Sequence, residues 1–357
     1  MNNQIEKWVR PEIRALAAYH VPDAGDFIKL DAMENPYTWP ESVVDDWLNI
    51  LREVSLNRYP DPSSSELKEG LRREMAIPPN MEILLGNGSD ELIQMILLTV
   101  LGPGRKVLSP EPSFSMYKMI STFVGLEFVG VALDDNFELD LAVMLEKIKQ
   151  HQPAVVFLAY PNNPTGNLFD DASIRAIIEA SPGLVVVDEA YHAFASRSFM
   201  DKLSQYDNVV VLRTLSKMGL AGLRLGLLVG SKAWLSQIDK VRLPYNINVL
   251  TQASTAFALK HHTMLEEQTA RIRKDREALM QQLASLAAIK VYPSQANFIL
   301  FRVAQGQASA IFEHIKGKGV LIKSMHGASP KLAHCLRVTV GTPDENDAFL
   351  AALKSAL

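Results

Sequence analysis

The chain has 357 residues, of which 48% are hydrophobic and 21% are charged; disordered, collagen-like and coiled-coil chains are thereby excluded. Lys and Arg number 36 against 40 Asp and Glu, a net charge of −4, which gives no electrostatic indication of nucleic-acid binding. The single cysteine, Cys335, excludes an internal disulfide and a cysteine-rich metal site. No apolar stretch is long enough to predict a membrane span, so we expect a cytoplasmic protein.

The first part of the chain predicts an arm followed by an α/β layer. Residues 1–29 hold prolines and isolated aromatic residues and predict an arm outside the main sheet. Short apolar runs then alternate with helix-length segments, and most runs lack polar–apolar alternation, as in strands buried on both faces of a mainly parallel sheet. This alternation predicts a doubly wound α/β structure. The expected strands are Glu82–Leu85, Lys106–Ser109, Glu127–Leu133, Ala154–Tyr160, Leu184–Val187, Val209–Leu212 and Leu225–Val229, and the expected helices are Glu91–Leu101, Ser113–Val124 and Leu139–Gln150.

The pattern changes after Pro244. Thr251–Leu286 predicts a long helix with a charged outer face, and the expected helix Ser309–Lys316 lies between two short strands, Asn297–Val303 and Leu336–Val340. These elements predict a smaller α+β domain. We therefore expect an arm at residues 1–29, a large domain at 30–248 and a small domain at 249–357.

Polar motifs follow the apolar runs of the predicted sheet. Because ligands of α/β sheets bind beyond the carboxyl ends of the strands, we expect these motifs to lie together. The motifs are Pro161-Asn-Asn-Pro-Thr-Gly166, Asp188-Glu-Ala-Tyr191, Ser216-Lys217, Gly222-Leu-Arg224 and the helix-opening Gly86-Asn-Gly-Ser-Asp90. Singly, each has an ordinary explanation: Asp188 as a helix cap, Lys217 as a surface lysine, Asn-Pro-Thr-Gly as a turn, and the glycine-rich loop as a nucleotide or S-adenosylmethionine loop. Together, a lysine, a carboxylate and an arginine at one sheet edge predict a site.

This set of motifs resembles the fold-type-I, pyridoxal-phosphate-dependent aminotransferases, and within them the histidinol-phosphate aminotransferases. Further matching segments are Lys29–Tyr37, Arg58–Pro62 and Leu336–Gly341, and the resemblance runs from about Ile28 to Pro343. It implies a large domain with a mostly parallel central sheet flanked by helices, plus a smaller α+β domain. It also implies a homodimer that transfers the amino group of histidinol phosphate to 2-oxoglutarate in a ping-pong cycle of histidine biosynthesis.

The resemblance also implies roles for individual residues. Lys217 would join pyridoxal phosphate covalently and move the substrate proton, and Asp188 would pair with the pyridine nitrogen. Asn163 and Tyr191 would hydrogen-bond the ring hydroxyl, and Phe114 would stack on the ring where many relatives have tyrosine. The cofactor phosphate would be held by Ser89, Asp90, Ser216 and Arg224, and by Tyr59 of the neighbouring subunit.

Substrate residues follow from the same resemblance. Arg337 would bind the carboxylate of glutamate or the phosphate of histidinol phosphate, and Lys323 stands where relatives often have arginine. Tyr19, Asn35 and Asn163 complete the expected substrate pocket. Met33 is a departure, because relatives usually have asparagine there. The histidines show no metal-ligand spacing, so no metal is expected.

Several other functions remain open at this point. A threonine-phosphate decarboxylase or an aromatic amino-acid aminotransferase has a similar motif pattern. A cofactor-binding regulator without turnover would usually carry an additional DNA-binding domain, and no basic helix–turn–helix is evident before the core. A methyltransferase would leave Lys217, Asp188 and Arg224 without a role.

Overall fold

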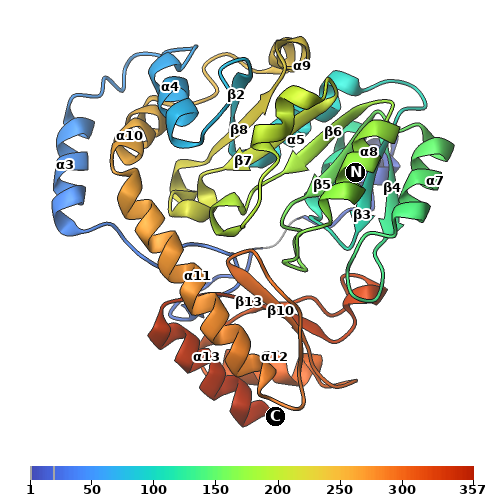
Figure 1. Cartoon of the computed structure of the whole chain (residues 1–357), viewed down its shortest axis with the longest axis vertical. Helices are drawn as coiled ribbons and strands as arrows, with labels where there is room; N and C mark the ends of the chain where they lie inside the picture. Colours follow the sequence, from blue (N-terminus) through green and yellow to red (C-terminus); the bar gives the residue numbers. More distant parts are fainter. Residues whose placement is uncertain (1, 19–20) are drawn as a thin grey trace.

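A twisted seven-stranded sheet forms the centre of the larger part of the molecule (Figure 1). The structure, a computed structural model, describes residues 2–18 and 21–357. The strand order is β2-β8-β7-β6-β5-β3-β4, and β8 alone runs antiparallel to its neighbours within these described residues. The strands are β2 (Glu82–Asn87), β3 (Lys106–Glu111), β4 (Glu127–Ala132), β5 (Val155–Ala159), β6 (Leu184–Asp188), β7 (Val209–Thr214) and β8 (Leu225–Gly230). The predicted mostly parallel sheet is confirmed.

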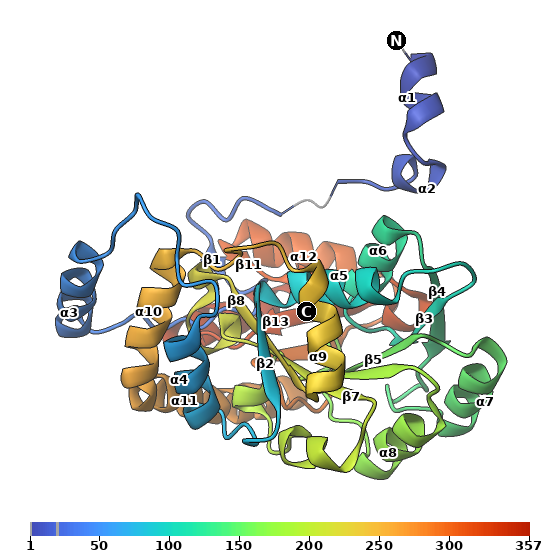
Figure 2. The same cartoon turned by 90° about the horizontal axis from the view of Figure 1, so that it is seen from above.

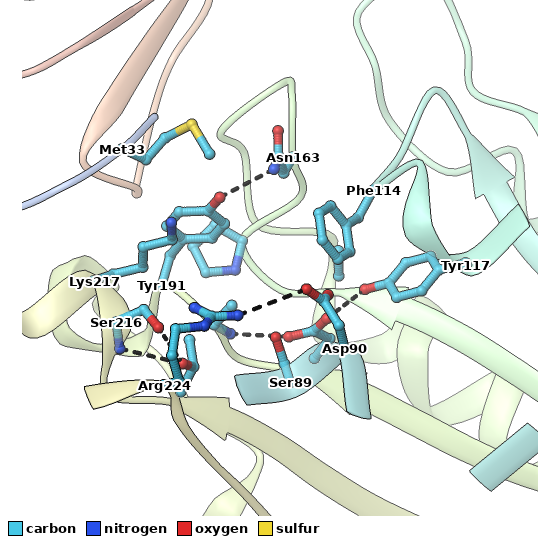
Figure 3. A pocket seen from close by; sticks show the side chains of 15 residues that line it. Met33, Ser89, Asp90, Phe114, Tyr117, Asn163, Tyr191, Ser216, Lys217 and Arg224 are labelled. Atoms are coloured by element: carbon cyan, nitrogen blue, oxygen red, sulfur yellow. Dashed lines mark hydrogen bonds and ion pairs between the residues drawn. The ribbon is translucent and has the colours of Figure 1, made fainter. Parts of the chain in front are cut away.

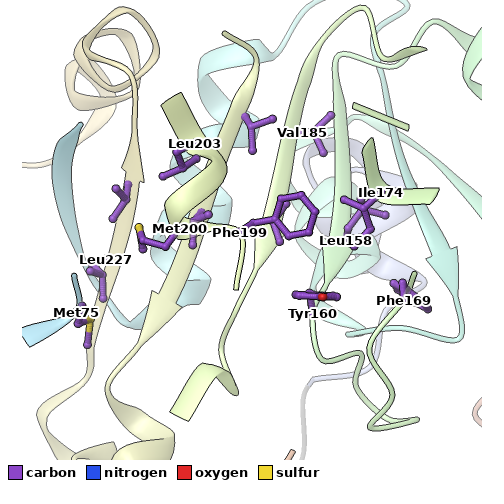
Figure 4. Packing of buried hydrophobic residues seen from close by; sticks show 14 of the residues in the cluster. Met75, Leu158, Tyr160, Phe169, Ile174, Val185, Phe199, Met200, Leu203 and Leu227 are labelled. Atoms are coloured by element: carbon purple, nitrogen blue, oxygen red, sulfur yellow. The ribbon is translucent and has the colours of Figure 1, made fainter. Parts of the chain in front are cut away.

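Helices cover both faces of this sheet, which explains why the central strands are apolar throughout. Every residue of β5, β6, β7 and β8 is buried. On one face Phe199 packs among Leu158, Ile174 and Met200 (Figure 4), and on the other face α5 and α6 pack against the sheet. The surrounding helices are α4 (Ser65–Glu74), α5 (Gly88–Val100), α6 (Met116–Val124), α7 (Leu141–His151), α8 (Asp171–Ala180), α9 (Lys232–Ile238) and α10 (Val249–Lys260).

The C-terminal part forms a second, smaller α+β layer. Its antiparallel sheet has the order β12-β13-β10-β9, and its core is a separate apolar cluster that includes Phe298, Phe301 and Phe349. The elements are α11 (His262–Ala284), β9 (Lys290–Val291), β10 (Phe298–Arg302), α12 (Ala308–Gly317), β11 (Val320–Leu321), β12 (Lys323–Ser324), β13 (Cys335–Thr339) and α13 (Pro343–Ala356). The long helix α11 runs from the large layer to the small one (Figure 1).

The N-terminal segment begins away from the body and then crosses between the layers. Figure 2 shows α1 (Asn2–Trp8) and α2 (Pro11–Arg14) projecting to one side. β1 (Ile28–Lys29) pairs in parallel with β11, and Leu30 belongs to the core of the small layer. The chain then continues to α3 (Glu41–Arg52). The division at residues 29 and 248 stays a prediction, and we note that residues 28–30 pack with the C-terminal layer.

Two features differ in detail from the sequence expectations. The predicted helix Thr251–Leu286 is two helices, because His261 has φ −105° and ψ 26° and interrupts the helical backbone between α10 and α11. Short 3-10 turns occupy several connecting segments: His192–Phe194, Met200–Gln205, Ser216–Met218, Ala221–Leu223, Asp239–Val241 and Pro330–Leu332. Among the helices that the structure describes, none is long and apolar enough to cross a membrane.

Candidate active site

A cavity lies at the carboxyl ends of the central strands, where the large and small layers meet (Figure 3). Its walls come from the ends of β2, β3, β5, β6 and β7 and the segments that follow them, from Arg224 directly before β8, and from the segment after β1. The lining residues are Met33, Ser89, Asp90, Phe114, Tyr117, Ala159, Pro161, Asn163, Asp188, Ala190, Tyr191, Thr214, Ser216, Lys217 and Arg224. The parallel strands thus bring the predicted motifs together as expected.

Lys217 projects into the cavity from the 3-10 turn after β7. Its Nζ donates a hydrogen bond to the carbonyl oxygen of Ala32 at 3.2 Å. Burial, and to a smaller degree the nearby Arg337 charge, lower the pKa of Lys217 to about 8. A substantial fraction of this amine is therefore neutral near pH 8, as a nucleophile or proton acceptor requires.

Asp188, the last residue of β6, lies at the floor of the cavity and is 3% exposed. Tyr117 Oη donates to Asp188 Oδ2 at 2.6 Å, and the Ala190 backbone N–H donates to Oδ1 at 3.0 Å. Burial raises the pKa of Asp188 to about 6, and the two hydrogen bonds oppose this rise. No cation neutralises this carboxylate among the contacts of the described residues, so it is prepared to accept a cationic hydrogen-bond donor.

A chain of hydrogen bonds connects the two layers at the side of the cavity. Asn163 Nδ2 donates to Tyr191 Oη at 3.0 Å, and Arg337 Nη1 donates to Asn163 Oδ1 at 2.6 Å. Arg337 Nη2 donates to the carbonyl oxygen of Asp31 at 3.0 Å, and its guanidinium stacks over Phe298 at 5.2 Å. Arg337 on β13 is therefore held within reach of the cavity, although it lies just outside the lining.

The end of the cavity formed by the first turn of α5 and by Arg224 is suited to an anion. Ser89 and Asp90 occupy the first turn of α5, where backbone N–H groups have no partner within the helix. Gly88 has φ +77°, a conformation that favours glycine, and a Cβ there would lie 2.8 Å from Nη2 of Arg224, so glycine leaves room for the guanidinium beside this turn. Ser216 Oγ lies 2.9 Å from Thr214 Oγ1, beside the same end. Burial raises the pKa of Asp90, and its Oδ1 is buried without a hydrogen-bond partner among the described residues.

The polar groups of the cavity fit a flat molecule that has a cationic ring and an anionic group. A carboxylate at the floor, hydroxyl and amide groups at one side, an anion-binding helix terminus and a lysine all face the same space. Phe114 adds an aromatic face and contacts Tyr117 edge-on at 5.5 Å between ring centroids.

The comparisons with known proteins agree with this geometry. The family profile "Aminotransferase class I and II" matches residues 25–353. The chain belongs to this family. A protein named histidinol-phosphate aminotransferase 2 from Nitrosococcus oceani is 59% identical over 353 residues, covering 99% of this chain and 98% of its own. A histidinol-phosphate aminotransferase from Chromobacterium violaceum is 51% identical, with 99% of each chain covered.

A solved structure shows the same fold. It is the histidinol-phosphate aminotransferase of Sinorhizobium meliloti in complex with pyridoxal-5'-phosphate. It superposes with a TM-score of 0.87 at 26% sequence identity, covering 98% of this chain and 97% of that chain. The predicted aminotransferase fold is therefore confirmed.

Some predicted site residues of this aminotransferase lie outside the cavity. Asn35 uses its amide elsewhere, because Nδ2 donates to the Met218 carbonyl oxygen at 3.2 Å and to Gln268 Oε1 at 2.9 Å. Lys323 is the cross-strand neighbour of Arg337 on β12. Tyr59 is 80% exposed. Tyr19 lies outside the described residues.

Two cavity residues of this aminotransferase were not assigned roles from the sequence. Tyr117 lies in the first turn of α6, where a buried aromatic residue is ordinarily part of the core, and the sequence pattern gives no signal of its bond to Asp188. Thr214 ends β7 two residues before Ser216, and its position after an apolar run is the one signal that favoured it.

Proposed function

We propose that this aminotransferase transfers the amino group of histidinol phosphate to 2-oxoglutarate, with pyridoxal phosphate as its cofactor, in histidine biosynthesis. The observation that carries the proposal is the 59% identity, over 99% of the chain, to a protein named for this activity. We further propose that the enzyme works in the cytoplasm. The cavity supports the chemistry because its charges match the cofactor at both ends.

Lys217 is the central residue of the proposed reaction. Bound pyridoxal phosphate withdraws electrons from the amino-bearing carbon of the substrate. Lys217 would hold the cofactor until the amine of the substrate displaces it, and the freed Nζ would then accept the proton from that carbon and donate it to the cofactor. The lowered pKa of about 8 suits both tasks, because a neutral amine accepts protons and attacks carbonyl carbons.

Asp188 and the anion-binding end orient the cofactor. The Asp188 carboxylate, held in place by Tyr117 and Ala190, would accept a hydrogen bond from the protonated ring nitrogen. At the other end the cofactor phosphate would be held by the backbone N–H groups of Ser89 and Asp90, the Ser216 hydroxyl and the Arg224 guanidinium. Along the side, Asn163 and Tyr191 would bind the ring hydroxyl, and Phe114 would stack on the ring.

Arg337 binds the anionic group of each substrate in turn. A guanidinium offers paired donors to a carboxylate or to a phosphate, so one residue serves glutamate and histidinol phosphate alike. Its side chain is 93% buried, which strengthens a charge-assisted contact. Lys323 lies beside it across the strand pair and adds a second positive charge.

The proposal includes a homodimer in which Tyr59 completes the site of the neighbouring subunit. Tyr59 stacks on Tyr245 with ring centroids 4.4 Å apart, yet it is 80% exposed. Leu56 and Leu243, in the same two loops, are 72% and 73% exposed. A group of exposed apolar side chains of this kind supports contact with a second copy.

The test is product formation by purified protein and by two lysine variants. The wild-type protein should form glutamate when both histidinol phosphate and 2-oxoglutarate are present, and Lys217→Ala should lower that rate by at least about a thousandfold. Lys232→Ala, an exposed lysine at the start of α9, is the matched control and should keep full activity. Normal turnover by Lys217→Ala would refute the assignment, and release of carbon dioxide from threonine phosphate without glutamate would favour a decarboxylase.

A further inference from the structure

Met33 forms the apolar wall of the cavity on the side of the small layer. Figure 3 shows its side chain above Lys217 and Tyr191, on the opposite side of the cavity from Ser89 and Arg224. The groups beside it are polar, namely the amine, amide and phenol of Lys217, Asn163 and Tyr191. Its thioether is therefore the one flexible apolar side chain facing this end among the described lining residues.

The backbone of Met33 is held in an unusual conformation. Its φ is +53°, in the left-handed region that side-chain-bearing residues seldom adopt. The Met33 N–H donates to Thr339 Oγ1 at 3.0 Å, and its carbonyl oxygen accepts from Asn297 Nδ2 at 3.0 Å. Both partners belong to the small layer, at β13 and just before β10. Strained backbone kept by specific bonds tends to occur where it places a functional side chain.

We propose that Met33 is a specificity-determining residue whose thioether packs against the imidazole ring of the substrate. This inference rests on the proposed function. In the proposed function Arg337 would hold the substrate anion and the amino-bearing carbon would face Lys217. Met33 and Lys217 line the same cavity, with Met33 above Lys217 in Figure 3, so the thioether borders the space that is left for the ring. A thioether suits the edge of an aromatic ring there, because sulfur is polarisable and the side chain adapts its shape.

The two half-reactions allow an internal comparison, because glutamate has no ring. We would measure kcat/KM for histidinol phosphate and for glutamate in wild-type protein, Met33→Asn and Met33→Leu. Asparagine tolerates left-handed backbone better than most residues, and it is the residue that relatives usually have here. Met33→Asn therefore keeps the fold while it removes the apolar contact that this chain has in place of the relatives' amide. The ratio of kcat/KM for histidinol phosphate to that for glutamate should fall about threefold to tenfold in Met33→Asn. Met33→Leu, which keeps an apolar side chain of similar volume, should retain most of the wild-type ratio.

Each outcome distinguishes this inference from the proposed function. Should both half-reactions of Met33→Asn fall by the same factor, or should the ratio stay at the wild-type value, Met33 has no part in ring recognition and the inference is overturned. An equal fall of the kcat/KM ratio in Met33→Leu and in Met33→Asn would also overturn the inference. Failure of the wild-type protein to accept histidinol phosphate would instead refute the proposed function. Circular dichroism and thermal unfolding of each variant exclude a general loss of fold.

Discussion

Replacing Asp188 by asparagine should stabilise the cofactor-free protein while it weakens the holoenzyme. The carboxylate is 3% exposed and has no cationic partner among the described contacts. Its pKa rises from 3.8 to about 6, and a rise of this size corresponds to about 3 kcal/mol in the free energy of unfolding. Between pH 3.8 and about pH 6 the Asp188 carboxyl keeps a proton in the folded protein but has lost it in the unfolded chain. The stability of the wild-type protein therefore falls as the pH rises through this range. The Asp188→Asn gain should therefore be complete above about pH 6 and should vanish below about pH 4.

Denaturant unfolding of the cofactor-free protein at pH 7.5 and at pH 4 measures this difference in the free energy of unfolding. In thermal unfolding at pH 7.5, the Tm of Asp188→Asn should be about 4 °C above that of the wild-type protein. The matched control is the adjacent Glu189→Gln. Glu189 is fully buried but accepts a hydrogen bond from Arg213 Nε at 2.9 Å, so its neutralisation leaves a buried cation and should destabilise by about 3–5 kcal/mol. With cofactor, Asp188→Asn should weaken binding by about a hundredfold or more. A destabilised cofactor-free Asp188→Asn protein, or unchanged cofactor affinity, would refute the reasoning.

Three further predictions concern the same site. Tyr117→Phe removes the hydrogen bond to Asp188 Oδ2, so the pKa of Asp188 should rise and the acid limb of the kcat/KM–pH profile should move up by about one pH unit; an unmoved profile contradicts this. The rate at which cofactor-free protein captures pyridoxal phosphate should increase with pH to a midpoint near the Lys217 pKa of about 8, whereas a midpoint near 10.5 would show that the amine is not desolvated. Mixing Tyr59→Ala with Lys217→Ala subunits should restore about a quarter of wild-type activity through hybrid dimers, and no restoration would indicate a site built within one subunit.

The sheet was predictable from the sequence because its strands are buried on both faces. Runs such as Leu184–Val187 and Val209–Leu212 are continuous and apolar, and the structure makes them β6 and β7. The break between α10 and α11 was not predictable, because His261 is neither proline nor glycine and gives no helix-ending signal in the sequence. The pairing of β1 with β11 is also invisible in sequence, because each strand has two residues.

The site was predictable to the extent that its residues follow strands. Asp188 ends β6, and Asn163 and Lys217 lie shortly after β5 and β7, so the parallel topology brings the three together. Tyr117 contributes from within a helix, and only the folded structure reveals that its hydroxyl points at Asp188. Met33 was noticed only as a departure from the family pattern, since a positive φ cannot be inferred for a methionine.

The measurement that tests the proposed function most directly is a two-step reaction of the purified holoenzyme, followed by cofactor absorbance and product analysis. Histidinol phosphate alone should convert the bound cofactor to its amino form in one turnover, and 2-oxoglutarate should then return it to the starting form with release of one glutamate per site. Steady-state rates with both substrates varied should give the parallel double-reciprocal lines of a ping-pong cycle. A cofactor spectrum that histidinol phosphate leaves unchanged, with no glutamate formed, would contradict the account.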